Sequence, residues 1–129
     1  MINITMRELI DSIEVFKFFL DQPMRAKTAY KLSLIIDIIE KENNKFNDLR
    51  NQLIQKYAER DENNNLIEKN NCYNIMPDKI PEFNKELNEL LDMELNLYID
   101  LLNLEDIENF ELTPRQLFKI NKYIKKQEP

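Results

Sequence analysis

The chain has 129 residues and a net charge of −6 at pH 7, and 43% of its residues are hydrophobic. This length corresponds to one domain with a buried core, and the negative charge argues against unaided binding to nucleic acid, which needs a basic surface. The sequence contains neither glycine nor histidine, which excludes glycine-rich phosphate loops and histidine-based catalytic or di-iron sites.

The expected compartment is intracellular. The single cysteine, Cys72, cannot form an intramolecular disulfide, which favours a reducing, cytoplasmic setting. The N-terminal stretch MINITMREL lacks a basic region followed by an apolar run, so we expect no secretion signal. No stretch approaches the ~20 apolar residues that span a bilayer, so we expect no membrane association.

The first half of the chain predicts two helices. In 5–20, apolar residues recur at steps of four, three and four, and Pro23 ends this helix. Nothing from 24 to 60 breaks a helix, and LSLIIDIIE (32–40) is apolar on more than one face. A helix of this length requires either a bend near Asn43 and Asn44 or a second helix alongside it.

The stretch RDENNNLIEKNNC (60–72) raises the possibility of a calcium-binding loop, because Asp61, Asn63 and Asn65 alternate. However, an EF-hand loop starting at Asp61 would carry leucine at its glycine position and Cys72 at its closing glutamate position. We therefore expect no metal site. The same letters predict a β-hairpin over 65–76, in which asparagine takes the positive φ angles of the turn.

The second half of the chain predicts two more helices. Two apolar rows run through 81–104, which makes this segment the expected antiparallel partner of the 24–60 helix. Thr113, Pro114 and Gln116 form a capping-box start for a helix over 114–126. Between these helices, ENFEL (108–112) alternates like a short strand.

These elements predict an all-α fold with a small β-hairpin. The long antiparallel helical hairpin would carry the β-hairpin between its two helices, and the helices 5–20 and 114–126 would flank it in one domain, 1–129. The apolar surplus on both long helices suggests that the protein forms a homo-oligomer.

The sequence resembles a family of small uncharacterised proteins from tailed phages and prophages of low-GC Gram-positive bacteria. The resemblance rests on Lys56 and Tyr57, on the DEN-N turn that begins at Asp61, on F-N-K-E-L-N-E-L-L (83–91) with Glu94 after it, and on the L-T-P helix start (112–114). Asn64 stands where the family has glycine. The resemblance implies a phage origin, the cytoplasm of the host cell and a helix–hairpin–helix shape, but no activity.

The candidate functional residues are therefore those suited to binding a protein partner from the phage or its host. NLEDIENFE (103–111) carries four carboxylates, and Glu94 interrupts an apolar row, where it forms either a rim carboxylate or a partner for Arg50. The predicted partner-binding set is Glu105, Asp106, Glu108, Glu111, Glu94 and Arg50. We expect no catalytic residues and no cofactor.

Four functions remain open from the sequence. The first is a non-enzymatic interaction or assembly protein, and the second is an inhibitor of a host defence or nucleic-acid enzyme, whose basic groove an acidic protein can occupy. The third is an enzyme, which no residue pattern favours. The fourth is a regulator that touches nucleic acid through the basic stretch KINKYIKK (119–126), although lysines are also favourable at any helix C-terminus.

Overall fold

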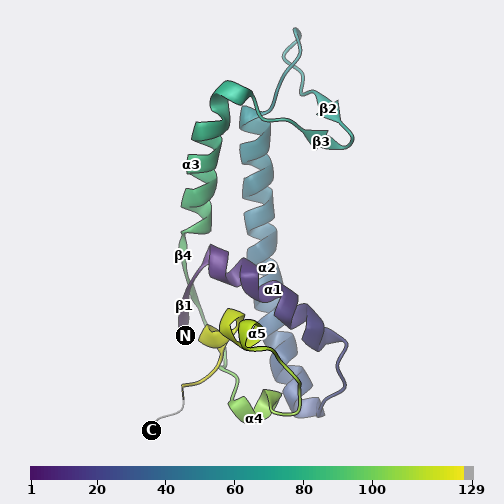
Figure 1. Ribbon diagram of the computed structural model, residues 1–129, viewed down its shortest axis with the longest axis vertical. Helices are drawn as coiled ribbons and strands as arrows, with labels where there is room; N and C mark the ends of the chain where they lie inside the picture. The colour runs from purple at the N-terminus through teal and green to yellow at the C-terminus, as the bar shows by residue number, and fades with distance from the viewer. Residues whose placement is uncertain (127–129) are drawn as a thin grey trace. The chain divides into compact units, whose positions relative to one another are not determined.

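The computed structural model describes residues 1–126, most of which are helical (Figure 1). The sequence predicts one domain over 1–129, and in the structure the chain divides into two compact units. The first unit comprises Met1–Asn43 and the chain from Glu94 onward, and the second unit comprises Asn44–Met93. Helix α2 (Ala26–Tyr57), which corresponds to the helix predicted over 24–60, contributes residues to both units.

The first unit begins with strand β1 (Ile2–Thr5) and helix α1 (Met6–Leu20), which confirms the helix predicted over 5–20. Thr5 and Glu8 form a capping box: the Thr5 hydroxyl accepts the Glu8 N–H at 3.2 Å, and the Glu8 carboxylate accepts the Thr5 N–H at 3.1 Å. The chain returns from the second unit as strand β4 (Glu94–Leu97), helix α4 (Leu104–Ile107), helix α5 (Pro114–Lys119) and the 3₁₀ helix η2 (Asn121–Tyr123).

The helix predicted over 81–104 is wrong beyond Leu91. Helix α3 (Ile80–Leu91) ends there, and β4 pairs antiparallel with β1, with Ile2 opposite Leu97 and Thr5 opposite Glu94. From Glu94 to Asp100 every second residue is exposed while the residues between are buried or half-buried, which is the period of a strand. The same leucines also fit helical spacing, and for this reason the sequence pattern indicated a continuous helix.

Two further expectations for the C-terminal part are wrong. The helix predicted over 114–126 begins with the predicted Thr113 capping box but ends at Lys119. Beyond η2, the chain instead bonds to Leu102, whose N–H donates to the Tyr123 carbonyl at 2.8 Å and whose carbonyl accepts the Lys125 N–H at 2.7 Å. ENFEL is no strand, because the Phe110 N–H closes a turn on the Ile107 carbonyl at 3.1 Å.

The core of the first unit forms where α1 meets the C-terminal elements. The Phe16 ring lies edge-on to the Tyr123 ring with 4.9 Å between centroids, and Phe19 lies 5.2 Å from Phe110. One polar pair is enclosed here: the Ser12 hydroxyl donates to the Leu9 carbonyl at 2.6 Å and lies 3.1 Å from the Tyr123 hydroxyl. Because the Ser12 proton is already used, Tyr123 is the donor to Ser12.

In the second unit, the predicted β-hairpin is confirmed with shorter strands, β2 (Glu68–Lys69) and β3 (Cys72–Tyr73). Asn70 and Asn71 take φ angles of 51° and 63° in its turn, as the sequence predicted for asparagine. Asn64, in the turn that follows Asp61, has a φ of 64°.

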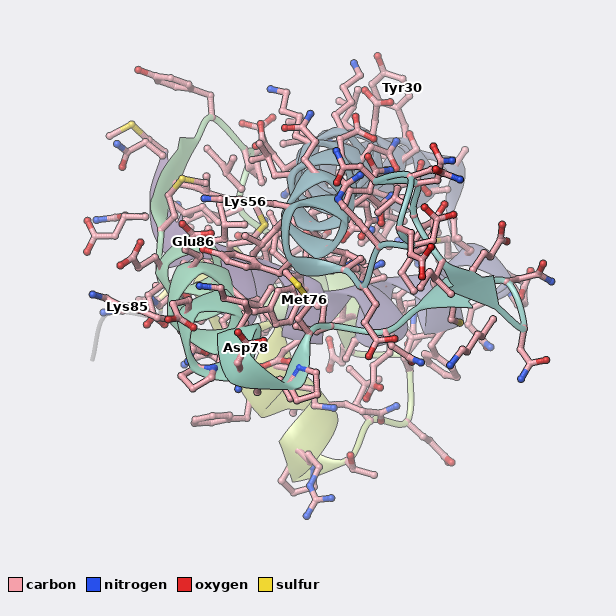
Figure 2. The ribbon with its side chains drawn as sticks, turned by 90° about the horizontal axis from the view of Figure 1, so that it is seen from above. Tyr30, Lys56, Met76, Asp78, Lys85 and Glu86 are labelled. Atoms are coloured by element: carbon pink, nitrogen blue, oxygen red, sulfur yellow. The ribbon has the colours of Figure 1, made fainter. Side chains whose placement is uncertain are left out.

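Within the second unit, the 3₁₀ helix η1 (Pro77–Lys79) leads into α3, and the end of α2 contacts α3. The Tyr57 and Phe83 rings lie edge-to-face at 6.4 Å, and the Lys56 ammonium donates to the Glu86 carboxylate at 3.0 Å (Figure 2). This carboxylate raises the pKa of Lys56. Earlier on α2, Leu53 is buried and Leu49 is 41% exposed.

Candidate functional site

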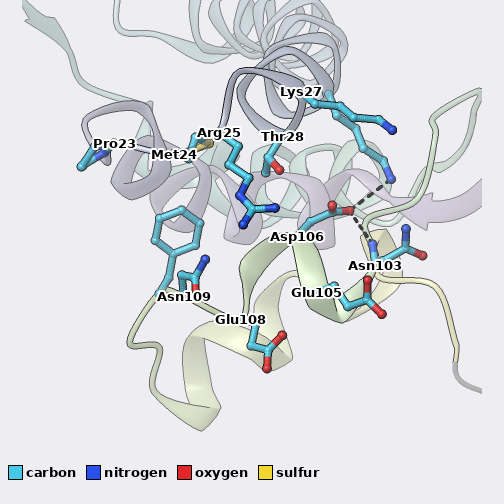
Figure 3. A pocket seen from close by; sticks show the side chains of 12 residues that line it. Pro23, Met24, Arg25, Lys27, Thr28, Asn103, Glu105, Asp106, Glu108 and Asn109 are labelled. Atoms are coloured by element: carbon cyan, nitrogen blue, oxygen red, sulfur yellow. Dashed lines mark hydrogen bonds and ion pairs between the residues drawn. The ribbon is translucent and has the colours of Figure 1, made fainter.

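The acidic segment 103–111 forms α4 and the loop after it. Within this segment, Asp106 is held by the fold: its carboxylate accepts the Asn103 N–H at 2.8 Å and the Lys31 ammonium at 3.2 Å (Figure 3). Burial raises the pKa of Asp106, but the hydrogen bonds from Asn103 and Lys31 outweigh it and lower the pKa below its ordinary value. Asp106 therefore fastens α4 to α2 in the first unit.

One side of this segment borders a mixed-charge cavity of about 830 Å³ between α4 and the start of α2. Arg25, the residue before α2, reaches into the cavity (Figure 3). The basic residues Arg25, Lys27 and Lys31 line one wall, and the acidic residues Glu105, Asp106 and Glu108 line the other. Since the two walls offset each other's charge, the cavity has no net preference for a cation or an anion.

The other side of the segment forms an apolar groove of about 560 Å³, which we call the α4–α5 groove. Its apolar lining comes from α4, from the loop after it and from α5: Leu104, Ile107, Phe110, Leu112 and Leu117. The exposed carboxylates Glu105 and Glu108 also border it. An apolar floor with a charged rim is the usual composition of a protein-binding surface.

The predicted site residues are thus only partly brought together. Glu105 and Glu108 border the α4–α5 groove, and Glu111 is exposed in the loop that supplies Phe110 and Leu112. Glu94 is exposed at the start of β4 opposite Thr5, away from the acidic segment in sequence. Arg50 is exposed on the part of α2 that belongs to the second unit.

Sequence reasoning missed a second apolar surface on the first unit, which we call the α2–β4 groove. It measures about 510 Å³, and its apolar lining includes Met1, Leu34, Ile38 and Tyr98. Tyr98 is 82% exposed and Met1 is 69% exposed. The available signal was the spacing of Leu34 and Ile38 by four residues on α2, within the stretch 32–40 that is apolar on more than one face.

The basic stretch 119–126 is partly neutralised by α1. Lys119 is paired with Glu14, and the Lys122 ammonium donates to the Glu8 carboxylate at 2.8 Å. Burial raises the pKa of Glu8, but the hydrogen bonds from Lys122 and Thr5 outweigh it and lower the pKa. Two of the lysines that would contact nucleic acid are therefore paired with carboxylates of α1 at the surface.

The calcium-like pattern has a structural explanation. One carboxylate oxygen of Asp61 accepts the N–H groups of Asn63 and Asn65, each at 2.9 Å, so the alternating side chains belong to a turn. Among residues 1–126, no three histidine, cysteine or acidic side chains gather as a metal site would require. Over the same residues, no helix combines the length and apolarity needed to cross a membrane.

We compared the chain with protein-family models, with curated proteins and with solved structures, and none of the three comparisons gave a match.

Proposed function

We propose that this chain is a non-enzymatic protein–protein interaction or assembly protein of phage or prophage origin, which binds its partner in the α4–α5 groove. The observation that carries the proposal is the placement of an apolar groove beside the acidic segment: five apolar side chains form its lining and Glu105 and Glu108 border it. The resemblance to phage proteins supports the origin.

The chemistry of the groove defines the partner. Leu104 lines the groove and is 42% exposed, so covering it would gain roughly 1 kcal/mol from its remaining apolar surface. The carboxylates of Glu105 and Glu108 favour lysine or arginine beside the partner's apolar residues. The partner segment that fits is therefore apolar in its centre and basic at its edges.

An inhibitor of a host defence or nucleic-acid enzyme is the second candidate, because the same acidic rim can occupy a basic nucleic-acid groove. Glu105, Glu108 and Glu111 are exposed and would supply the negative charges. This candidate predicts strong competition between the protein and nucleic acid for the host enzyme, which an assembly role does not.

We further propose that the end of α2 and helix α3 form a short antiparallel helical hairpin that supports the β-hairpin. The contacts of Tyr57 with Phe83 and of Lys56 with Glu86 support this arrangement, since the residue numbers rise on one helix as they fall on the other. Leu49, Leu53 and Leu90, which line one groove in the second unit, continue the same order.

The test is affinity capture of the tagged full chain from a lysate of phage-infected Gram-positive host cells. We compare the unaltered protein with Leu104→Glu, which places a carboxylate in the α4–α5 groove, and with Leu34→Glu as a matched control. Leu34 is 47% exposed and Leu104 is 42% exposed, so the two changes perturb the fold similarly. Circular dichroism verifies that both variants are folded.

We expect a stoichiometric partner with the unaltered protein and with Leu34→Glu, and at least about 30-fold weaker binding with Leu104→Glu. Binding should also weaken as salt rises, since the rim charges contribute. A host nuclease or immune protein as the partner would select the inhibitor role, and a phage structural protein would select assembly. Equal capture by Leu104→Glu, or capture of no other protein, would refute the proposal.

A further inference from the structure

The α2–β4 groove combines a protruding aromatic side chain and a receiving hollow on one surface. Tyr98 is 82% exposed, and it borders the same groove of about 510 Å³ as Leu34 and Ile38. Tyr30 lies one helical turn before Leu34 on α2, is 68% exposed and points away from the helix (Figure 2). Met1 lines the groove as well and is 69% exposed. Exposed apolar side chains that share one surface mark a candidate interaction site.

We infer that the α2–β4 groove binds a second copy of this chain and forms a two-fold symmetric dimer. Around a two-fold axis each copy presents the same surface, so the Tyr98 ring of one copy enters the hollow beside Leu34 and Ile38 of the other, and the reverse contact forms at the same time. The inference goes beyond the proposed function, because it concerns a different surface and a different occupant.

The charges at the two grooves favour different occupants. Lys31 and Asp37 border the α2–β4 groove, and each is paired within its own chain, Lys31 with Asp106 and Asp37 with Lys41. Their charges are therefore largely offset before a second copy approaches. The α4–α5 groove is bordered only by carboxylates among its charged lining residues, so a second copy there would oppose like charges. A second copy therefore suits the α2–β4 groove and a basic partner suits the α4–α5 groove.

Tyr98 supplies a substantial part of the area that a dimer interface needs. At 82% exposure it offers roughly 160 Å² of surface. A standard interface buries about 800 Å² on each partner, of which somewhat more than half is apolar. Tyr98 alone thus supplies about a third of the apolar area required, and Met1 and Leu34 in the same groove add to it.

The test is sedimentation equilibrium of the full chain over a range of concentrations. We expect the unaltered protein to reach twice the mass of the chain, and Tyr98→Glu or Leu34→Glu to weaken self-association by at least about 30-fold. Tyr98 is the safer position for the fold because its side chain is almost fully exposed. Leu104→Glu, in the other groove, should leave self-association unchanged.

Three results would overturn the inference: a monomer at every concentration, a dimer that neither Tyr98→Glu nor Leu34→Glu weakens, or a dimer that Leu104→Glu weakens equally. The outcome is separate from that of the proposed function. If Leu34→Glu loses the dimer, partner capture through the α4–α5 groove can still be measured on this variant. If Leu104→Glu loses partner capture, dimer formation can still be measured on that variant.

Discussion

The buried hydroxyl pair of Ser12 and Tyr123 makes an asymmetric prediction for stability. Both residues are fully buried, Tyr123 donates to Ser12, and Ser12 donates to the Leu9 carbonyl. In Tyr123→Phe one hydrogen bond is lost while the Ser12 proton keeps its acceptor, so the free energy of unfolding should fall by about 1 kcal/mol.

Ser12→Ala should cost more, because it leaves the Tyr123 O–H buried without its acceptor. An unsatisfied buried donor costs roughly 1–3 kcal/mol, of which the better helix propensity of alanine in α1 returns about 0.5 kcal/mol. We therefore expect a loss of about 2 kcal/mol. The double variant removes both polar groups together and should cost less than about 1 kcal/mol, below the cost of Ser12→Ala alone.

Urea unfolding of the four proteins at pH 7, followed by circular dichroism, measures these free energies. Equal costs for the two single variants, or a double variant whose cost is the sum of theirs, would refute the assignment of Tyr123 as the donor. Such a result would mean that another group accepts the Tyr123 proton when Ser12 is replaced.

The same pair predicts how stability changes in alkali. Burial raises the pKa of Tyr123 to about 12, against about 10 in the unfolded chain, so the folded state holds this proton more tightly. The stability that comes from this tighter proton binding is fully present below about pH 10. It is lost as pH rises toward 12, by roughly 2–3 kcal/mol in all. Tyr123→Phe lacks this group, so the stability difference between the two proteins should shrink and then reverse across that range.

Two further predictions concern α4 and the turn of the β-hairpin. Asp106→Asn should lower the free energy of unfolding by about 1 kcal/mol at pH 7, after allowance for partial exposure. The reason is that Lys31 and Asn103 then donate to a neutral amide instead of a carboxylate. Since the pKa of Asp106 is lowered in the fold, its contribution to stability is present above the carboxyl's unfolded pKa and is lost in acid. The variant should therefore be as stable as the unaltered protein at about pH 2. A stability difference that persists at about pH 2 would show that the charge of Asp106 is not its cause. Asn71→Ala should cost about 1 kcal/mol because alanine resists the φ of 63°, whereas Asn71→Gly should cost less, and thermal unfolding that ranks them in the opposite order would contradict the turn assignment.

Local signals in the sequence predicted local structure well. The start of α5 depends on a capping box that spans four residues, and the turn at Asn70 and Asn71 depends on two residues. Each of these features is decided by its own neighbours in the chain. For that reason the residue types alone were sufficient to predict them.

Distant pairing was not predictable in the same way. Leu95 and Leu97 fit a helix as well as a strand, and only the presence of Ile2–Thr5 beside them decides for the strand. The candidate site shows the same limit. The acidic run 103–111 marked Glu105 and Glu108 as candidate site residues. The apolar side chains beside them form a groove only together with Leu117 of α5. No signal near 103–111 indicates that contribution.

The second unit is continuous in the chain, whereas the first unit is assembled from two segments separated by it. During synthesis, α1 therefore leaves the ribosome long before Phe110 and Tyr123, against which Phe16 and Phe19 pack in the finished protein. Until then this aromatic face has no native cover from the C-terminal segment and is open to chaperones or to wrong contacts. The pairing of β1 with β4 likewise closes a long loop, so the first unit should fold more slowly than the second.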